Sequence, residues 1–282
     1  FLPVYFGYER VVEGATYIGE LSGAPKEKES VFGLLRSLKV LKERFGVVHV
    51  NIGEPIRLDE VLDRHDPQWR EREIDDDVRL PWVSAAVDDL ALHIMRNINA
   101  AAAVTPINLL ATTLLATPRQ SLPEPDLQRQ LDLYLALMRA APYSNRVTVT
   151  TQTSTEIIAY GEAMKVVTRE KHTLGDVVRM SEGSAVLTTY FRNNVLHLFA
   201  MPSLVACAFA SNATMRTEDI QRLAWRIYPY IASELFLRWS EQELPAVIES
   251  VLAALAQHGL IEPNADGTQW QRPPWVSPKP MQ

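Results

Sequence analysis

The segment from Phe1 to Glu9 constrains the fold of this 282-residue chain most strongly. It combines β-branched and aromatic side chains, and no capping or turn residue precedes Phe1, so the pattern predicts that the sequence begins inside a β-strand. An apolar strand without partners leaves backbone amides and carbonyls unsatisfied. We therefore expect this strand to pair within the chain and to have further neighbours in a longer protein.

A second strand is predicted at 47–52, where apolar residues alternate with His49 and Asn51. Between the two strands, a helix is expected to start at Ser30, and Gly46 supplies a residue that tolerates a left-handed C-terminal turn. A strand, a crossover helix and a second strand favour parallel pairing in an α/β sheet. The expected fold class is an α/β fragment followed by a predominantly α-helical region.

Four segments organise the chain. Residues 1–62 form the α/β part, and residues 63–82 are predicted to be a polar linker. The acidic run 75–77 within this linker is either solvated or a cation ligand. Residues 83–262 are predicted to be mostly helical, and 263–282 contain too many prolines for a regular element.

Apolar periodicity predicts the individual helices of this region. They are expected at 83–99, with a stripe that includes Val87, and at 125–139 and 156–166, the last starting after Ser154 or Thr155. A fourth helix follows a capping box from Ser240 to Glu243 and ends at Gly259.

Two uncharged stretches, 98–117 and 195–213, approach the length of a membrane span. Each contains a proline near its middle, Pro106 and Pro202, together with several polar residues. The prolines favour buried core helices that are kinked or interrupted, rather than spanning helices. A membrane-surface role stays open for any apolar face that is left exposed.

Composition excludes several classes of function. The net charge of −6 and the pI of about 5.6 give no general attraction to nucleic acid or to anionic lipid. The single cysteine, Cys207, cannot form an internal disulfide, and its apolar neighbours predict that it is buried. The sequence contains no metal-ligand spacing and no Gly-rich phosphate loop, so no cofactor is expected.

Several motifs resemble the bacterial membrane-associated glycerol-3-phosphate 1-O-acyltransferases. Pro-Val-Tyr-Phe-Gly-Tyr-Glu at 3–9, continued by Gly-Ala-Pro-Lys-Glu-Lys-Glu-Ser at 23–30, is similar to the fourth conserved block of that family. The strand ending in Gly-Glu-Pro-Ile at 53–56, and the segments 190–195 and 234–239, extend the likeness. The resemblance implies that residues 1–62 end an acyltransferase α/β domain and that the helical region follows it.

The same resemblance implies the reaction and its surroundings. An acyl group would pass from acyl-CoA or acyl-carrier protein to the sn-1 hydroxyl of glycerol 3-phosphate. The enzyme would lie peripherally on a lipid surface, the cytoplasmic face of the bacterial inner membrane. Dihydroxyacetone-phosphate acyltransferases share the strand signature and form the nearest alternative. The competing class is a non-catalytic helical module that docks on membrane or on a partner protein.

The family's catalytic His-x4-Asp motif is not found in this chain. None of the six histidines has Asp five positions later; those positions hold Glu54, Arg70, Ile98, Val177, Pro202 and Pro263. The pair His172 and Asp176 is one residue too close, and we expect it to lie in a solvated loop. The catalytic residues are therefore expected upstream of Phe1, and the chain alone is expected to be inactive.

Four residues are candidates for substrate contact. The resemblance places Pro3 and Tyr5 in a block associated with acyl-CoA binding, although Pro3 can equally be an ordinary strand-entry proline. Lys26 and Lys28 precede a predicted helix N-terminus and could contact a phosphate, or could belong to a solvated loop of alternating charge.

Two further charged residues carry expectations. Glu9 is acidic, so it is not expected to contact phosphate directly. Arg192 stands in a stretch with little charge, so it is expected to pair with an acid or a backbone carbonyl.

Overall fold

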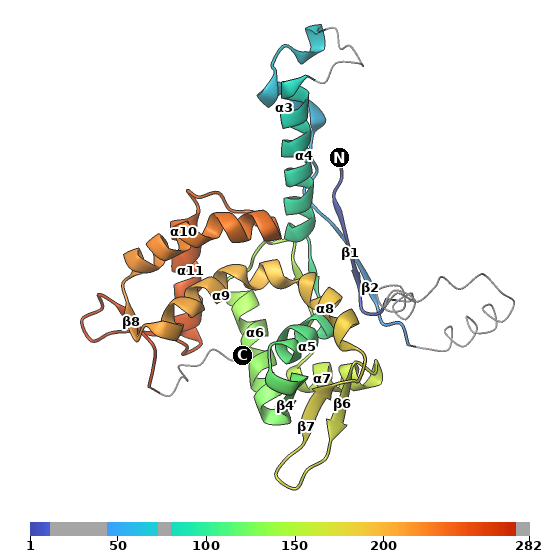
Figure 1. Ribbon diagram of the computed structural model, residues 1–282, viewed down its shortest axis with the longest axis vertical. Helices are drawn as coiled ribbons and strands as arrows, with labels where there is room; N and C mark the ends of the chain where they lie inside the picture. Colours follow the sequence, from blue (N-terminus) through green and yellow to red (C-terminus); the bar gives the residue numbers. More distant parts are fainter. Residues whose placement is uncertain (12–43, 73–79, 275–282) are drawn as a thin grey trace, which may run out of the picture.

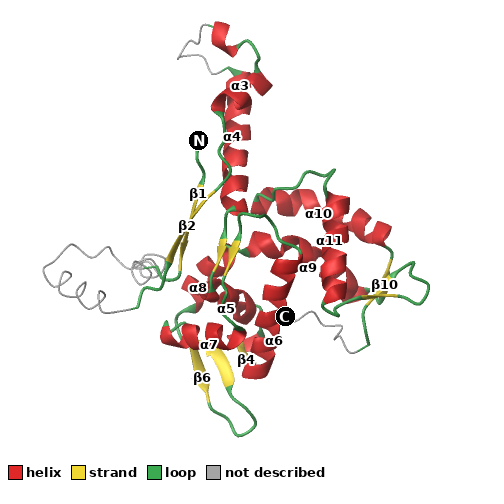
Figure 2. Cartoon of the chain, turned by 180° about the vertical axis from the view of Figure 1, so that it is seen from behind, coloured by secondary structure: helices red, strands yellow, loops and turns green. Residues whose placement is uncertain are grey.

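The computed structural model describes residues 1–11, 44–72 and 80–274. This part of the chain has three regions, which Figure 1 shows side by side. A two-stranded ribbon consists of β1 (Val4–Tyr8) and β2 (Val48–Ile52). An arm of two helices projects beyond it, and a mostly helical body follows. The expected mixture of a short β segment and a long helical region is confirmed, but small sheets interrupt the helices (Figure 2).

The ribbon is antiparallel, so the parallel pairing expected from the sequence is wrong. Val4 faces Ile52 and Tyr8 faces Val48 across the ladder. Order along the chain does not fix strand direction, because a long connection can return the second strand either way. The helix expected from Ser30 lies outside the described residues, except that Arg44 and Phe45 at its end are not helical. Gly46 has φ +75°, a left-handed conformation that glycine tolerates, although no helix is described immediately before it.

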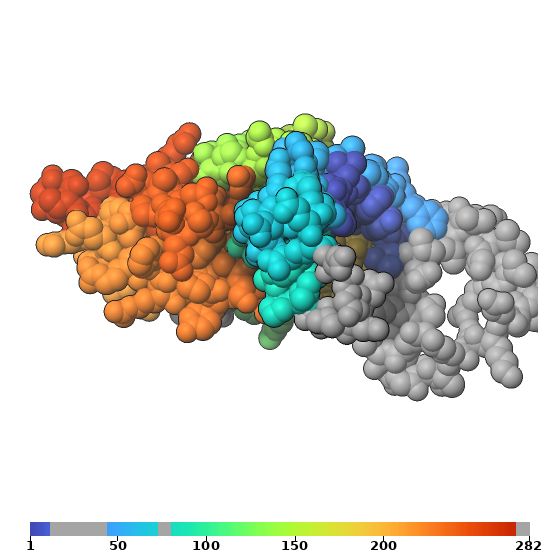
Figure 3. Space-filling view, turned by 90° about the horizontal axis from the view of Figure 1, so that it is seen from above, coloured from blue at the N-terminus to red at the C-terminus, as the bar shows by residue number. Residues whose placement is uncertain are grey.

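The arm is formed by α3 (Leu58–His65), the short 3₁₀ turn η1 (Trp69–Glu71) and the long helix α4 (Pro81–Ala100). Seen from above, it rises between the ribbon and the C-terminal helices (Figure 3). The predicted buried stripe of α4 is wrong at Val87, whose side chain is 55% exposed, whereas the adjacent Ala86 is buried. Helix α4 packs mainly on α3 and also contacts β1, and its apolar stripe is left partly uncovered.

The centre of the body is α5 (Pro106–Leu115), which is buried along nearly its whole length. Thr105 caps it reciprocally with Asn108, and Pro106 occupies the first turn. The predicted interruption of the apolar stretch at Pro106 is therefore confirmed. Three helices surround α5: α6 (Glu124–Ala140), α7 (Ser154–Ala163) and α8 (Ala185–Asn193).

Two small sheets in this part of the body were not predicted. One has the antiparallel order β4 (Ser121–Pro123), β7 (Val177–Met180), β6 (Val167–Glu170), and it follows the 3₁₀ turn η2 (Pro118–Gln120). The other is a parallel pair of β3 (Ala103–Val104) and β5 (Thr148–Val149). Helix α7 ends at Ala163, before the predicted end, because the chain turns there into β6.

The C-terminal part of the body contains α9 (Leu196–Ser211), α10 (Thr217–Leu235) and α11 (Leu244–Gln257). Pro202 lies inside α9 without ending it. Cys207 is exposed on this helix, so its predicted burial is wrong; its apolar neighbours in sequence point to other sides of the helix. The predicted capping box is present in part, since the Glu243 carboxylate accepts from the Ser240 amide at 2.7 Å, although α11 begins only at Leu244.

The tail beyond α11 is more regular than predicted. Strands β9 (Glu262–Pro263) and β10 (Trp270–Gln271) pair with each other, and β10 also pairs with β8 (Thr214–Met215). These short strands form because they pair with segments elsewhere in the fold, and local composition does not reveal such pairing.

Among the described residues, no single helix has the length and apolar character of a membrane span. The pair α8 and α9 meets that test only when taken together, and the two helices are bent by 81° at their junction.

Candidate functional site

The inward face of β1 carries the two described candidates from the sequence. Pro3 and Tyr5 lie on this face because side chains alternate along a strand, and both are buried. The Pro3 carbonyl accepts a hydrogen bond from the Gly53 amide at 2.9 Å. The Tyr5 hydroxyl donates to the Ala103 carbonyl at 3.4 Å. Burial raises the pKa of Tyr5 to about 12, so its phenol stays neutral and cannot serve as a base near neutral pH.

Glu9 continues the same face and fastens the ribbon to the body. Its carboxylate is buried, 3% exposed, and accepts hydrogen bonds from the Val47 amide at 2.7 Å and from the Tyr160 hydroxyl on α7. Desolvation and the hydrogen bond to Glu9 both raise the pKa of Tyr160. Glu9 thus joins the ribbon to α7 through hydrogen bonds within the protein.

The end of β2 is held close to the arm. An ideal Cβ on Gly53 would lie 2.6 Å from the Asn97 carbonyl oxygen, so only glycine fits at this point of the Gly-Glu-Pro motif. Asn97 donates to the Glu54 carbonyl at 2.8 Å, and Arg146 forms an ion pair with the Glu54 carboxylate. The motif noted in the sequence therefore has a structural reason, which is the close contact of strand and helix.

Lys26 and Lys28 lie outside the described residues. The structure brings Pro3 and Tyr5 together on one strand, where protein atoms rather than a cavity face them. A groove of about 390 Å³ lies elsewhere, between α10 and α11, and is lined by Trp225, Arg222 and Ile248 among others.

The pair His172 and Asp176 lies at the β6–β7 hairpin and is not a catalytic dyad. His172 is exposed, and its Nδ1 accepts from the Leu174 amide at 3.2 Å. Asp176 instead faces Arg169, at 3.6 Å. The predicted solvated loop is confirmed.

Arg192 has a different partner from the one expected. Its guanidinium donates to the side-chain oxygen of Asn193 at 3.0 Å rather than to an acid or a backbone carbonyl. Asn193 is the next residue along the helix, and its side-chain amide lies within hydrogen-bond distance of Arg192. The sequence alone does not show that this amide, rather than an acid or a carbonyl, is the partner.

Sequence reasoning missed one cluster, in which a single carboxylate joins the two helices of the arm. Asp89 on α4 accepts from Arg64 at 2.9 Å and lies 3.1 Å from His65 Nε2, both on α3. His93, one turn later, lies 3.0 Å from the same carboxylate. Partial burial opposes ionisation, yet the hydrogen bonds from Arg64 and His65 hold the pKa of Asp89 below its usual range. Only the i,i+4 spacing of Asp89 and His93 was visible in the sequence.

A buried histidine in the body also has a structural role. His197 on α9 is buried, and its Nε2 donates to the Asn99 carbonyl at 3.0 Å. Desolvation lowers the pKa of His197 to about 4, so the ring is neutral at physiological pH. Within the described ranges, no group of three or more His, Cys, Asp or Glu side chains is arranged to hold a metal ion. Asp89 and His197 hold helices together through these contacts.

Comparison with known proteins decides the family. Residues 17–279 match the family described as "Glycerol-3-phosphate acyltransferase C-terminal region". The chain belongs to this family. The region is 48% identical over 266 residues to a protein of Pseudomonas paraeruginosa named glycerol-3-phosphate acyltransferase, covering 94% of this chain and 32% of that protein.

Other relatives of the same name agree. The protein of Pseudomonas syringae pv. tomato is 45% identical over 280 residues, which cover 99% of this chain and 33% of the relative. The protein of Xanthomonas campestris pv. campestris is 48% identical over 262 residues, or 93% and 30% of the two chains. The chain therefore spans about a third of the length of the curated relatives it matches.

Proposed function

We propose that this chain supplies the C-terminal region of a bacterial enzyme that transfers a fatty acyl group from acyl-CoA or acyl-carrier protein to the sn-1 hydroxyl of glycerol 3-phosphate. The observation that carries the proposal is the 48% identity over 94% of the chain to a protein named glycerol-3-phosphate acyltransferase. An upstream His, oriented by an Asp, would deprotonate the hydroxyl as it attacks the thioester. The thiol of the carrier leaves.

The proposed role of the chain is to support the reaction rather than to move its proton. Pro3 and Tyr5 would shape a wall of the acyl-CoA site from behind, because both are already engaged with backbone groups of the same protein. Lys26 and Lys28 would contact phosphate of coenzyme A or of glycerol 3-phosphate.

An acylation assay with labelled acyl-CoA and glycerol 3-phosphate tests the division of labour. A full-length enzyme that contains these 282 residues should form 1-acylglycerol 3-phosphate, and the isolated chain should not. Turnover by the isolated chain that is lost in His172→Ala would contradict the assignment of the catalytic residues to the upstream part. Dihydroxyacetone phosphate, offered as the acceptor in parallel, tests the nearest alternative reaction.

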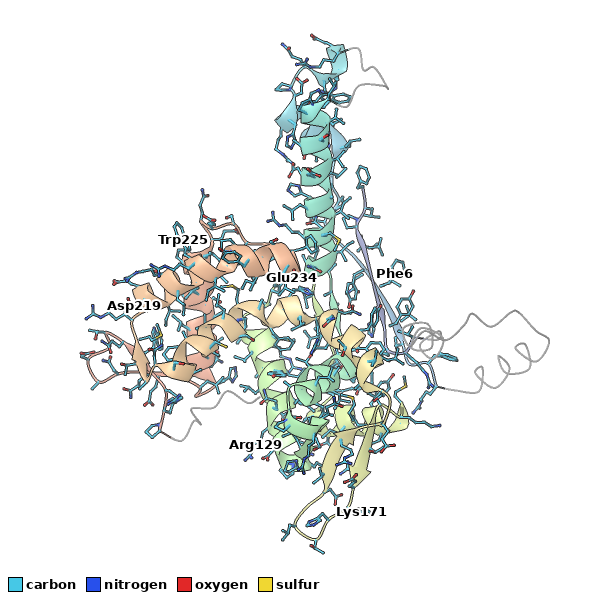
Figure 4. The ribbon with its side chains drawn as sticks, viewed as in Figure 1. Phe6, Arg129, Lys171, Asp219, Trp225 and Glu234 are labelled. Atoms are coloured by element: carbon cyan, nitrogen blue, oxygen red, sulfur yellow. The ribbon has the colours of Figure 1, made fainter. Side chains whose placement is uncertain are left out.

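The lysines can be tested in the same full-length enzyme. Exchange of both Lys26 and Lys28 for Gln should raise the KM for the phosphate-bearing substrate that they contact and leave kcat nearly unchanged. Lys171→Gln is the matched control, because Lys171 is an exposed lysine at the far end of the β6–β7 hairpin (Figure 4). Equal KM values for the double variant and the control would remove both lysines from the substrate site.

We also propose that the full-length enzyme lies on the cytoplasmic face of the inner membrane without crossing it. Helix α10 carries two exposed aromatic side chains, Trp225 at 56% and Tyr230 at 79%, and rings of this type suit the interface between lipid and water. Arg222 and Arg226 lie on the same helix and suit anionic headgroups.

Attachment of this kind should resist high salt and yield to detergent, because apolar contact contributes more than charge. Tags near Ser144 and near Asn264 decide between lying on the membrane and crossing it. If protease reached the two tags from opposite faces of sealed vesicles, the bent pair α8 and α9 would be a span and the peripheral arrangement would be wrong.

A further inference from the structure

The face of the ribbon that points away from the body is entirely apolar. We call it the outer face and define it by three cross-strand pairs: Val4 with Ile52, Phe6 with Val50, and Tyr8 with Val48. Phe6, Val50 and Ile52 are each more than half exposed, at 52%, 55% and 56%. Phe6 lies on β1 beside the body in Figure 4.

This arrangement differs from that of a sheet with one face in water. Antiparallel sheets normally place apolar side chains on the core and polar ones in water. Here the face against the body carries Glu9, His49 and Asn51, of which Asn51 donates to the Ala101 carbonyl at 2.9 Å and to Thr148 Oγ1 at 3.0 Å. The same inner face also carries the buried Pro3 and Tyr5, whereas the apolar outer face is left to solvent. The outer face therefore suits a second core on its own side.

The exposed apolar side chains are concentrated on the ribbon. Among the described residues, sixteen large apolar side chains are exposed, and eight of them lie within 1–8 and 47–52. Scattered exposed apolar residues are normal, whereas a contiguous group of this kind marks an interaction surface.

We propose that the outer face is covered by the part of a glycerol-3-phosphate acyltransferase that precedes its C-terminal region. The inference rests on the proposed function. The matched relatives have about twice as much additional chain as this region, and the family is described as C-terminal, so much of that additional chain precedes it. A preceding segment would join at Phe1, whose amino nitrogen lies 2.8 Å from the Ile56 carbonyl at the end of the ribbon.

A protein surface suits the outer face better than lipid does. Among the described residues, β1 and β2 pair only with each other, so each strand offers an open edge of amides and carbonyls. Hydrocarbon cannot satisfy such groups, and open sheet edges facing lipid are correspondingly excluded. A protein partner can pair with the edges and pack on the apolar side chains at the same time. The occupant is therefore an apolar face of the preceding domain.

Cysteine labelling in the full-length enzyme tests the inference. In a background with Cys207→Ala, the variant Val50→Cys reports on the outer face. Leu174→Cys is the exposed control, since Leu174 is 92% exposed, and Val205→Cys is the buried control, at 0%. A water-soluble maleimide should label Val50→Cys at least about tenfold more slowly than Leu174→Cys, because reaction requires opening of the interface. Labelling of Val50→Cys as fast as Leu174→Cys would overturn the proposal.

Two further arms identify what covers the face. In the 282-residue chain without the preceding part, Val50→Cys should be labelled within a few-fold of Leu174→Cys; protection already present there would assign the cover to this chain or to a second copy of it, and would overturn the proposal. Protection in the full-length enzyme should persist after solubilisation in mild detergent. Its loss on solubilisation would assign the cover to the bilayer instead.

Acylation assays on the same Val50→Cys enzyme separate this inference from the proposed function. An active enzyme with a rapidly labelled outer face would contradict the inference and leave the function standing. A protected outer face in an enzyme that acylates no glycerol 3-phosphate would support the interface and contradict the function.

Discussion

The helical body buries its apolar residues, whereas the ribbon leaves many of its apolar side chains exposed. In the body, the central helix α5 has Ile107, Leu109 and Leu114 at 0% exposure, surrounded by α6, α7 and α8. In the ribbon, Val48 and Val50 are more than half exposed. The body therefore completes its core with its own residues. The ribbon has a core-like surface whose complement lies outside the described chain.

The two regions also differ in what holds them. The ribbon is attached through polar groups, such as Asn51 on the Ala101 carbonyl and Glu9 on the Tyr160 hydroxyl. Hydrogen bonds fix orientation and contribute about 0.5–1.5 kcal/mol each between neutral groups, and about 1.5–3 kcal/mol when one partner is a charged group such as a carboxylate. Apolar packing dominates the body, with Leu110 pressed against Gly161 on α7. The buried Tyr5 adds apolar contact on the inner face of the ribbon. A ribbon that is held on one face and exposes apolar side chains on the other is suited to an interface between two parts of a larger protein.

The largest effect expected from this comparison is at the centre of the body. Leu110→Ala removes a side chain with 0% exposure and leaves a cavity against Gly161, so the free energy of unfolding should fall by about 3 kcal/mol. Phe6→Ala removes a larger side chain from the outer face, yet in the isolated chain it should change that free energy by less than about 0.5 kcal/mol. Urea unfolding of the 282-residue chain measures both.

The same pair of variants can break the comparison. In the full-length enzyme Phe6→Ala should become much more costly, because the outer face is proposed to be covered there. A loss at Phe6 in the isolated chain equal to that at Leu110 would mean that the chain itself packs on the outer face, and the distinction between the two regions would fail.

A second effect concerns pH and belongs to the body alone. Burial holds the pKa of His197 near 4, below the ordinary 6.5, so the unfolded chain binds a proton that the folded chain does not. Stability should therefore be fully present above pH 6.5 and fall as the pH drops towards 4, by about 1.4 kcal/mol per unit. Between pH 6.5 and pH 5 this single group should account for about 2 kcal/mol.

Unfolding curves at both pH values check the histidine. His197→Gln should lose much of the acid sensitivity, whatever its stability at neutral pH. His172→Gln, which alters an exposed ring at the hairpin, should keep it. If His172→Gln and His197→Gln showed the same pH dependence, the buried ring would not be its source.

Local signals allowed much of the body to be predicted. The helices α6 and α11 follow apolar stripes that face the core, and Pro106 and Gly259 mark element boundaries as expected. What failed depends on contacts distant in sequence. The direction of β2, the pairing of β8 with β10, and the exposure of Val87 are decided by neighbours that no short window contains.

The candidate site divides in the same manner. The sequence pattern pointed to Pro3 and Tyr5, but not to their engagement with Gly53 and Ala103. The absence of a His-x4-Asp motif was visible directly in the sequence. The Asp89 cluster joins residues that are 24 and 25 positions apart to a local i,i+4 pair, so only its local half could have been found.

A smaller effect on stability is expected from the capping box at the start of α7, which tests whether a local sequence signal fixes a helix end in the body. The Thr153 hydroxyl accepts from the Glu156 amide at 3.3 Å, and the Glu156 carboxylate accepts from the Thr153 amide at 2.8 Å. Thr153→Ala removes half of this capping box and should cost about 1 kcal/mol of unfolding free energy. Thr151→Ala, two residues earlier and also exposed, is the control and should cost little. Equal losses would show that the cap does not define the start of α7.

The smallest effect is expected in the arm, which is neither a closed core like the body nor an apolar surface like the ribbon. Asp89→Asn removes the charge that Arg64 and His65 share, and should weaken the contact of α3 with α4 by about 0.5 kcal/mol, as for other partly exposed ion pairs. The pKa of Asp89 is depressed, so this contribution is present above its ordinary pKa of 3.8 and lost as the pH falls below it. Hydrogen exchange of the α3 amides at pH 6 should be faster in Asp89→Asn than in Asp88→Asn, whose exposed carboxyl has no ionic partner among the described residues. Equal exchange in the two variants would show that apolar packing at Val61, rather than the carboxylate, joins α3 to α4.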